Sequence, residues 1–404
     1  MDTATVDKWI EGVAGERART AIPEGFPDLP DIPARRYTDP DFFVQERQAL
    51  WRGTWLYAGH VDQLREPGSF FVWRFGSAPI LVVRGEDKVI RAFYNTCRHR
   101  GAPIAREEEG LLSRAVVCGY HGWTYDRQGN LRGVTDRRDW PQDVKSTRNL
   151  VPVRCELFGN WIFLCESADE PSLATFLKPI AHNFAHLKLE TLRLVSRRRH
   201  QLACNAKIVI ENFLEAYHFR MLHAGTTDRI FDNTGTKIFL WENGHSMMLS
   251  PNRRDGWVDP GTIGMPEIPN ATEIERRHNP SYSIFPNFIL PVSPTGMPAV
   301  CIWPVTAQTS VLEVLWFAPG WGDGPRPPLW DTRIANFDRI VDEDIQFADS
   351  MQETVDSPGC TGVPLSYQER RIYHWHEELD RRIGGDRVAP RLRVEPRLAA
   401  FLDD

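Results

Sequence analysis

Two short segments of the sequence each combine one cysteine with one histidine. Cys97 and His99 are separated by one residue, Cys118 and His121 by two, and 18 residues lie between His99 and Cys118. A tight turn in each segment would bring the two thiols and two imidazoles together. Thiolates and imidazoles are common protein ligands of iron and zinc. The spacing therefore predicts a metal centre with four protein ligands.

The mixed composition of each segment indicates which metal is bound. Two thiolates on one iron and two imidazoles on the other describe a [2Fe–2S] centre of the Rieske type, whose reduction potential lies above that of an all-cysteine cluster. A zinc site also takes two Cys and two His, but zinc fingers use a Cys pair and a separate His pair. Gly101, Gly119 and Gly122 beside the ligands would let backbone N–H groups approach the cluster sulfurs. We therefore expect the Rieske cluster rather than zinc.

A second set of candidate ligands lies on residues 207–223, which are rich in helix formers and contain no Gly or Pro. On a regular helix His218 and His223 would point about 140° apart, because each residue turns the helix by about 100°. Both can bind one metal only if the helix loosens there, through a π-bulge or by ending near Leu222. Considered alone, the two residues are equally well explained as ordinary surface or core histidines.

An acidic helix later in the chain, residues 341–352, can supply the missing carboxylate. Two histidines and one carboxylate on one face of an iron leave open positions for O₂ and substrate, as in the facial triad of non-haem Fe(II) oxygenases. Asp344 is our candidate for the third ligand, and Glu343 remains the alternative. Asp342 and Asp349 are expected on the solvated face of the helix.

The composition excludes several classes of protein. The chain has 404 residues, of which 42% are hydrophobic, and a formal net charge of −6, so it can build one or two large cores and has no nucleic-acid signature. It contains no run of 18 apolar residues and no secretory signal, so we expect a cytoplasmic protein without a membrane span. The five cysteines outside the cluster do not suggest a disulfide framework and are expected to be buried small apolar residues, which fits a reducing compartment.

Hydrophobic patterns divide the chain into three parts. Residues 1–53 are predicted to form an N-terminal arm and a helix, over 39–52, that packs on the C-terminal part. Residues 54–166 contain short β-branched and aromatic runs between turn residues, and are predicted to be a small all-β domain that carries the cluster. Residues 167–404 combine strand-like and helical patterns, which predicts an α+β domain with an antiparallel sheet flanked by helices.

Finer expectations follow from the same patterns. A single buried strand is expected over 157–165. In the C-terminal part we expect helices over 171–186, 207–223, 331–353 and 367–382, and strands over 193–204, 237–249, 281–290, 299–306 and 309–317.

With both metal-binding segments in this order, the sequence resembles the α subunits of Rieske non-haem iron oxygenases, the ring-hydroxylating oxygenase superfamily. The resemblance covers nearly the whole chain. Its most specific stretches are Cys-Arg-His-Arg-Gly, Cys-Gly-Tyr-His-Gly-Trp and Glu-Asn-Phe-Leu-Glu-Ala-Tyr-His-Phe-Arg-Met-Leu-His. It implies a helix-grip catalytic domain. The implied ligands are Cys97 and Cys118 on one cluster iron, His99 and His121 on the other, and His218, His223 and Asp344 on a mononuclear Fe(II).

The resemblance also implies a head-to-tail homotrimer, in which the cluster of one subunit faces the mononuclear iron of its neighbour. Most dioxygenases of the family have an aspartate that bridges these two centres three residues before the first iron histidine. This sequence has Glu215 there. Glutamate can keep the bridging role with one more methylene of reach. With glutamate at this position, the sequence is similar to the subgroup of the family that oxidises quaternary amines, such as choline and carnitine monooxygenases.

The family's chemistry is reductive activation of O₂, with electrons from NAD(P)H delivered by a separate reductase, in some cases through a ferredoxin. This chain has no Gly-x-Gly-x-x-Gly signature at a strand-to-helix turn, so a partner is expected to bind the nicotinamide.

Two reactions stay open: hydroxylation of an aromatic or other hydrophobic compound, which is slightly favoured, and monooxygenation next to nitrogen with N-dealkylation or C–N cleavage. A pure electron carrier would be a short chain without the second iron site. The sequence does not determine the substrate or the presence of a small β subunit.

Candidate pocket residues lie next to the iron ligands and on residues 282–290, which resemble the family's pocket-lining segment. An apolar, aromatic lining would favour a flat hydrophobic substrate, and an aromatic cage would suit a methylated ammonium. The aromatic candidates are equally compatible with a place in the core. The candidates are Asn212, Phe219, Phe231, Ile284, Phe285 and Asn287.

Overall fold

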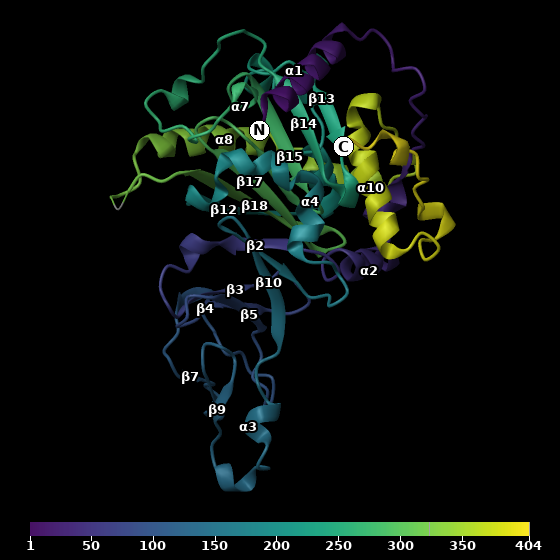
Figure 1. Cartoon of the computed structure of the whole chain (residues 1–404). Helices are drawn as coiled ribbons and strands as arrows, with labels where there is room; N and C mark the ends of the chain where they lie inside the picture. Colours follow the sequence, from purple (N-terminus) through teal and green to yellow (C-terminus); the bar gives the residue numbers. More distant parts are fainter. Residues whose placement is uncertain (323, 404) are drawn as a thin grey trace. The chain divides into compact units, whose positions relative to one another are not determined.

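The computed structural model describes residues 1–322 and 324–403 and divides into two compact units (Figure 1). One unit is formed by residues 51–173, and the other by residues 1–50 together with 174–404. None of the helices in the described ranges is long and apolar enough to cross a membrane.

The smaller unit is built from antiparallel sheets, and its core includes Cys97, Cys118, Trp123 and Tyr125. A seven-stranded sheet has the order β2 (Leu56–His60), β11 (Trp161–Cys165), β10 (Pro152–Phe158), β5 (Ile90–Tyr94), β4 (Ile80–Arg84), β3 (Ser69–Trp73) and β6 (Glu109–Leu111). A three-stranded sheet has the order β7 (Val116–Val117), β8 (Thr124–Tyr125) and β9 (Leu131–Gly133), and a short helix, α3 (Val144–Thr147), follows it.

The larger unit contains a second antiparallel sheet of seven strands with helices packed around it (Figure 1). Its order is β12 (Leu192–Leu202), β18 (Thr309–Pro319), β17 (Met297–Thr306), β16 (Phe288–Pro291), β15 (His278–Ile284), β14 (Ser246–Pro251) and β13 (Lys237–Leu240). Its helices are α1 (Thr3–Ala18), α2 (Pro40–Ala49), α4 (Leu173–Phe184), α5 (Ala206–Asn212), α6 (Phe219–Leu222), α7 (Glu273–Arg277), α8 (Leu329–Ile345), α9 (Ala348–Val355) and α10 (Arg370–Ile383). The predicted α+β class is confirmed.

Several predicted elements are interrupted where the chain turns. The segment 157–165 was expected to be one strand, but it spans the hairpin of β10 and β11, with Gly159 at a φ of +57° in the turn. The segments 237–249 and 281–290 are likewise hairpins rather than single strands, because β13 pairs with β14 and β15 pairs with β16. The expected helix over 331–353 is divided into α8 and α9.

Helix α1 was not predicted. It contains Gly12 and Gly15, which lower helix propensity, and its buried residues are limited to Trp9, Val13 and Glu16. These three lie on one face, so tertiary contacts rather than a strong local pattern stabilise the helix. The helix expected at residues 39–52 is confirmed as α2, with Asp39 accepting from the N–H groups of Asp41 and Phe42 as its N-cap.

Candidate metal centres and cavity

The two cysteine–histidine segments of the smaller unit have the same backbone conformation. In each, the cysteine N–H donates a 2.8 Å hydrogen bond to a carbonyl five residues later, and the glycine four residues after the cysteine donates back to the cysteine carbonyl at 3.0 Å. These glycines, Gly101 and Gly122, have φ values of +80° and +70°, which a side chain would make unfavourable. The predicted tight turns therefore place Cys97 and Cys118 in equivalent positions.

The two histidines of these turns lie together. The ring centroids of His99 and His121 are 4.5 Å apart, and Trp123 stacks on His99 at 5.0 Å. Burial and the neighbouring His121 lower the pKa of His99, which keeps its imidazole neutral. Its Nδ1 is buried and has no hydrogen-bond partner among the described residues. A neutral, unpaired and buried nitrogen fits a metal ligand.

The hydroxyl of Tyr125 contacts one of the cysteines. Its oxygen accepts a hydrogen bond from the Arg98 N–H at 3.0 Å and lies 3.4 Å from Sγ of Cys97. Because the oxygen already accepts from Arg98, its O–H is free to donate to the sulfur. A donor in this position stabilises negative charge on a thiolate ligand.

In the larger unit, the segment expected to form one helix over 207–223 breaks between α5 and α6. The carboxylate of Glu215 accepts hydrogen bonds from the backbone N–H groups of Tyr217 and His218, the latter at 3.2 Å. A side chain that takes backbone donors in this way competes with the helical hydrogen bonds. The other oxygen of Glu215 lies 2.5 Å from Nδ1 of His218. Glu215 therefore both breaks the helix and orients the imidazole.

The break allows two histidines five residues apart to face one carboxylate. Oδ1 of Asp344 lies 2.9 Å from Nε2 of His223 and 3.4 Å from Nε2 of His218. One potential ligand atom from each of the three residues lies within 4.8 Å of the other two. The structure thus brings together the three predicted ligands, and this donor set fits a ferrous ion.

Hydrogen bonds set the charges of these groups. Burial lowers the pKa of His218, but hydrogen bonds to Asp344 and Glu215 outweigh burial and raise the pKa to about 9. Burial would raise the pKa of Asp344, whereas the two histidines hold it below its usual value. The carboxylate is therefore ionised, which is the form that binds a metal.

Glu343, the alternative third ligand, contacts the other side of His223. Its Oε2 lies 2.7 Å from Nδ1 of His223 and accepts a hydrogen bond from the Thr226 hydroxyl at 2.5 Å. The contact fixes the imidazole so that Nε2 points toward Asp344. The geometry favours Asp344 as the ligand and Glu343 as the residue that orients His223.

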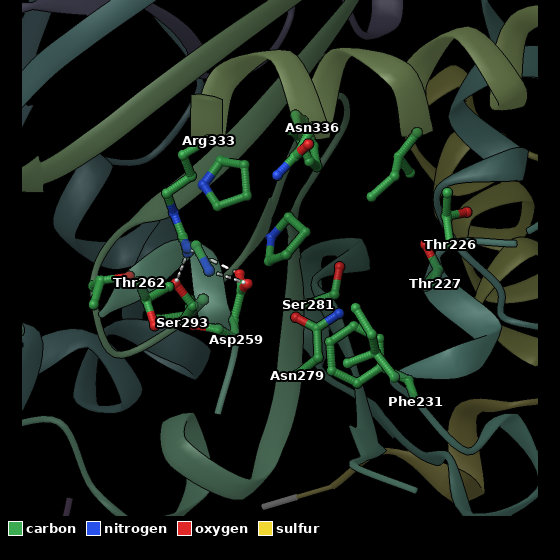
Figure 2. Close-up of a pocket in the computed structure, with 18 of the residues that line it drawn as sticks. Thr226, Thr227, Phe231, Asp259, Thr262, Asn279, Ser281, Ser293, Arg333 and Asn336 are labelled. Atoms are coloured by element: carbon green, nitrogen blue, oxygen red, sulfur yellow. Dashed lines mark hydrogen bonds and ion pairs between the residues drawn. The ribbon is translucent and has the colours of Figure 1, made fainter. Parts of the chain in front are cut away.

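The three residues lie in the wall of a cavity of about 630 Å³. Asn212, Phe219 and Phe231 also line it, as the sequence predicted. Figure 2 shows Phe231 with the two threonines Thr226 and Thr227 on one side of the cavity.

Three predicted pocket residues are wrong, because Ile284, Phe285 and Asn287 do not line the cavity. Asn279 and Ser281 of β15 point into it (Figure 2), and side chains alternate along a strand, so Ile284 faces the opposite side. Phe285 packs near Trp375, with ring centroids 5.7 Å apart. The amide of Asn287 donates to the carbonyl of Ile302 at 2.9 Å. These three side chains belong to the core.

Other residues of the cavity were missed. Arg333 is the most informative, because it precedes Asp344 by eleven residues on α8, and eleven residues of helix bring a side chain back to within about 20° of the same direction. That spacing was visible in the sequence. Asp259, which contacts Arg333, lies on a loop without periodicity and carried no such signal.

Comparison with known proteins finds two family models that match the chain. A family model described as the Rieske [2Fe-2S] domain matches residues 54–148, and one described as the ring-hydroxylating alpha subunit (catalytic domain) matches residues 189–385. The first match contains the four cysteine and histidine residues of the smaller unit, and the second contains His218, His223 and Asp344.

Individual relatives span two kinds of oxygenase. The glycine betaine monooxygenase oxygenase subunit of Pseudomonas aeruginosa is 31% identical over 192 residues, which are 48% of this chain and 44% of that protein. The carnitine monooxygenase oxygenase subunit of Escherichia coli is 29% identical over 215 residues, which are 52% of this chain and 57% of that protein. The chain thus matches about half the length of these relatives. Naphthalene 1,2-dioxygenase from Rhodococcus sp. shares the fold, with a TM-score of 0.77 at 21% identity over 89% of this chain and 95% of that one.

Proposed function

Because this chain belongs to the Rieske-type ring-hydroxylating oxygenase α subunits, we propose that it is the terminal oxygenase of a multicomponent system. It would use O₂ and electrons from NAD(P)H to oxygenate a small organic molecule. The observation that carries the proposal is the convergence of His218, His223 and Asp344 on one point in the wall of a cavity. Two histidines and one carboxylate leave open positions on the metal for O₂ and substrate.

In this proposal, Cys97, His99, Cys118 and His121 hold a [2Fe–2S] cluster, and His218, His223 and Asp344 hold a mononuclear Fe(II). When bound, these groups supply the electrons and the O₂ chemistry. The chain supplies orientation: Glu215 holds His218 through Nδ1, Glu343 holds His223 through Nδ1, and Asn212 holds the carboxylate of Asp344. The aromatic rings of Phe219 and Phe231 in the cavity wall would limit access of water to the reacting atoms.

We further propose that electrons arrive from a separate NAD(P)H-dependent reductase, directly or through a ferredoxin. The oxygenase would act as a head-to-tail homotrimer, with or without a small β subunit. Glu215 would then bridge His218 to a cluster histidine of the neighbouring subunit. Its Oε1 is committed to His218, and Oε2 is the oxygen that could accept from the neighbour after releasing a backbone donor.

Two substrate classes are compatible with the cavity. Phe219 and Phe231 near the triad suit an aromatic or other hydrophobic compound, which would be hydroxylated. The same rings can attract a methylated ammonium, which would be oxidised next to nitrogen and lose an alkyl group. Glu215 and the relatives that act on glycine betaine and carnitine favour this second candidate.

A single-turnover experiment tests the proposal. The reconstituted protein is reduced chemically, freed of reductant and mixed with O₂ and a panel of arenes and quaternary amines. An oxygenated arene would support the first reaction, and formaldehyde or a freed amine would support the second. Metal analysis and EPR on the same material should show a [2Fe–2S] cluster and one further iron per chain. Zinc in place of the cluster, or no iron beyond it, would overturn the assignment.

A further inference from the structure

Arg333 lies in the wall of the cavity, far along α8 from the metal-binding triad. Arg333, Phe337, Ile340 and Asp344 all line the cavity, and their spacing of four, three and four residues places them on one face of the helix. Figure 2 shows Arg333 on one side of the cavity and the threonines that adjoin the triad, Thr226 and Thr227, on the other. The cavity therefore runs along α8 from a metal site to a guanidinium.

The guanidinium is buried, which is uncommon for an arginine. The Arg333 side chain is 9% exposed and its Cζ lies 5.1 Å from the ring centroid of Trp316. The other two arginines that line the cavity in the described part of the chain, Arg276 and Arg339, are exposed. Arg333 thus places a positive charge inside the cavity rather than at its rim.

Side chains of this protein accept hydrogen bonds from only some of the guanidinium N–H groups. Nη1 donates to Asp259 at 3.1 Å and Nη2 donates to the Ser293 hydroxyl at 2.8 Å. Nε is buried and has no partner among the described residues. The Asp259 side chain is 44% exposed and comes from a surface loop, so water can solvate it readily if the pair opens. A guanidinium offers five N–H groups in a planar fork that matches a carboxylate.

We propose that Arg333 binds a carboxylate of the substrate, so that this oxygenase acts on small organic carboxylates held with the acid group away from the metal. The proposal rests on the proposed oxygenase function and adds the substrate class. Asp259 occupies the guanidinium as an internal competitor and yields to the ligand. The intervening Phe337 and Ile340 provide an apolar wall for the body of the substrate.

The helix also sets the length of the substrate. Eleven residues of α-helix separate Arg333 from Asp344 by about 16 Å along the axis. After allowance of about 4 Å at each end for contact with the metal site and with the guanidinium, the carboxylate should lie roughly 6–10 Å from the carbon that is oxidised. This distance between the carboxylate and the oxidised carbon is longer than the corresponding distance in the shortest arylacetates or betaines.

Binding to the reconstituted holoenzyme tests the proposal by calorimetry. The probes are phenylacetate, phenylbutanoate and phenylhexanoate, a parallel series of trimethylammonio-alkanoates, and the primary amide of each. We expect each best-fitting acid to bind about 10- to 100-fold more tightly than its amide, as expected for a hydrogen-bonded charge. Affinity should rise toward the longer acids. Equal binding of acids and amides by the wild type would overturn the proposal.

Two variants separate ligand binding from a structural role. Arg333→Gln should remove the preference for acids while leaving amide binding within about threefold. Asp259→Asn should retain the preference or strengthen it, because the competitor for the guanidinium is weakened. A preference that survives in Arg333→Gln would overturn the proposal. So would a loss in Asp259→Asn as large as that in Arg333→Gln, since it would show that the pair is a structural brace.

The same samples distinguish this inference from the function on which it rests. If the bound acids are oxygenated in single turnover, both stand, and the comparison of the phenyl and trimethylammonio series identifies the head group. If acids bind selectively but no probe is oxygenated and the second iron is absent, the oxygenase proposal fails while the carboxylate site stands. If amides are bound and oxygenated as readily as acids, the carboxylate site fails while the oxygenase stands.

Discussion

Asn212 donates a hydrogen bond of 2.8 Å to Oδ1 of Asp344, the same carboxylate oxygen that faces both histidines. Asn212 is the last residue of α5, directly before the break that Glu215 produces, so the end of the helix and the position of the carboxylate are coupled. The side chains of Asn212, His218 and His223, all from one short segment, thus converge on a carboxylate oxygen from a helix more than 120 residues later.

The contact from Asn212 predicts a role in metal affinity. Asn212→Ala should weaken iron binding about 10- to 100-fold, the usual effect of removing a group that orients a ligand. Iron retained per chain after dialysis against a graded chelator measures the change. Asn279→Ala is the matched control, because Asn279 lines the same cavity but is not among the described residues that hydrogen-bond to His218, His223 or Asp344. Equal iron retention in Asn212→Ala and the wild type would contradict the prediction.

The two neighbouring acids should differ in their effect on iron. Asp344→Asn should lose the mononuclear iron, since the neutral amide is a poor ligand, while the visible absorbance of the cluster persists. Glu343→Gln should keep the iron with affinity reduced about tenfold, because only the orientation of His223 suffers. Metal analysis of both variants, prepared in parallel, measures the contrast. If the two results were exchanged, Glu343 would be the ligand.

Glu215 should matter for electron transfer more than for metal content. Glu215→Ala should leave both centres occupied and slow reoxidation of the reduced cluster by O₂, with substrate bound, by roughly 100-fold or more. The reason is that the variant loses the carboxylate on Nδ1 of His218. Stopped-flow absorbance measures this rate. Glu215→Asp should recover part of it, whereas a wild-type rate in Glu215→Ala would rule out the bridge.

The Tyr125 hydroxyl should raise the potential of the cluster. A donor to Cys97 stabilises the more negative, reduced state, so Tyr125→Phe should lower the potential by roughly 40 mV, the equivalent of one hydrogen bond of about 1 kcal/mol. A redox titration followed by EPR measures it. Tyr120→Phe serves as control, because Tyr120 is 60% exposed and contacts His121 through its ring. Unchanged potentials in both variants would show that the hydroxyl does not act on the sulfur.

Glu211, a buried acid in the larger unit, should make stability depend on pH. Burial raises its pKa from 4.5 to about 8, although the hydroxyl of Tyr37 lies 2.9 and 2.8 Å from its two oxygens and partly opposes the shift. Between these pH values the folded chain holds a proton that the unfolded chain has lost, so stability falls as pH rises toward about 8.

Glu211→Gln should therefore lose less stability than the wild type between pH 6 and pH 9, with a difference of roughly 2 kcal/mol. The amide can still accept from Tyr37 and donate to Nε2 of His376, which lies 2.9 Å from Glu211. Urea unfolding followed by circular dichroism at both pH values measures the difference. Tyr37→Phe should steepen the dependence, because the donor that favours the charged carboxylate is removed. Parallel profiles for the wild type and Glu211→Gln would exclude this site as the cause.

The sequence alone was sufficient for the cluster segments and the class of fold. The turns at Cys97 and Cys118 close through hydrogen bonds over five residues and need only a glycine at the correct place, so residue type and spacing carry the information. The α+β class and the existence of α10 follow from periodicity, and α2 has the N-cap Asp39 in addition; these are also local properties. The two histidines and Asp344 could be proposed as candidates for the same reason.

Only the tertiary structure decided how these candidates meet. The helix break at Glu215 depends on a side chain competing with backbone hydrogen bonds, and the choice between Asp344 and Glu343 depends on the rotation of α8 against His223. The face of β15 that lines the cavity depends on which side of the sheet carries α8, so Ser281 and not Ile284 reaches it. Arg333 donates a hydrogen bond to Asp259, a loop residue 74 positions away. Each of these outcomes comes from contacts between distant segments, which periodicity and spacing do not encode.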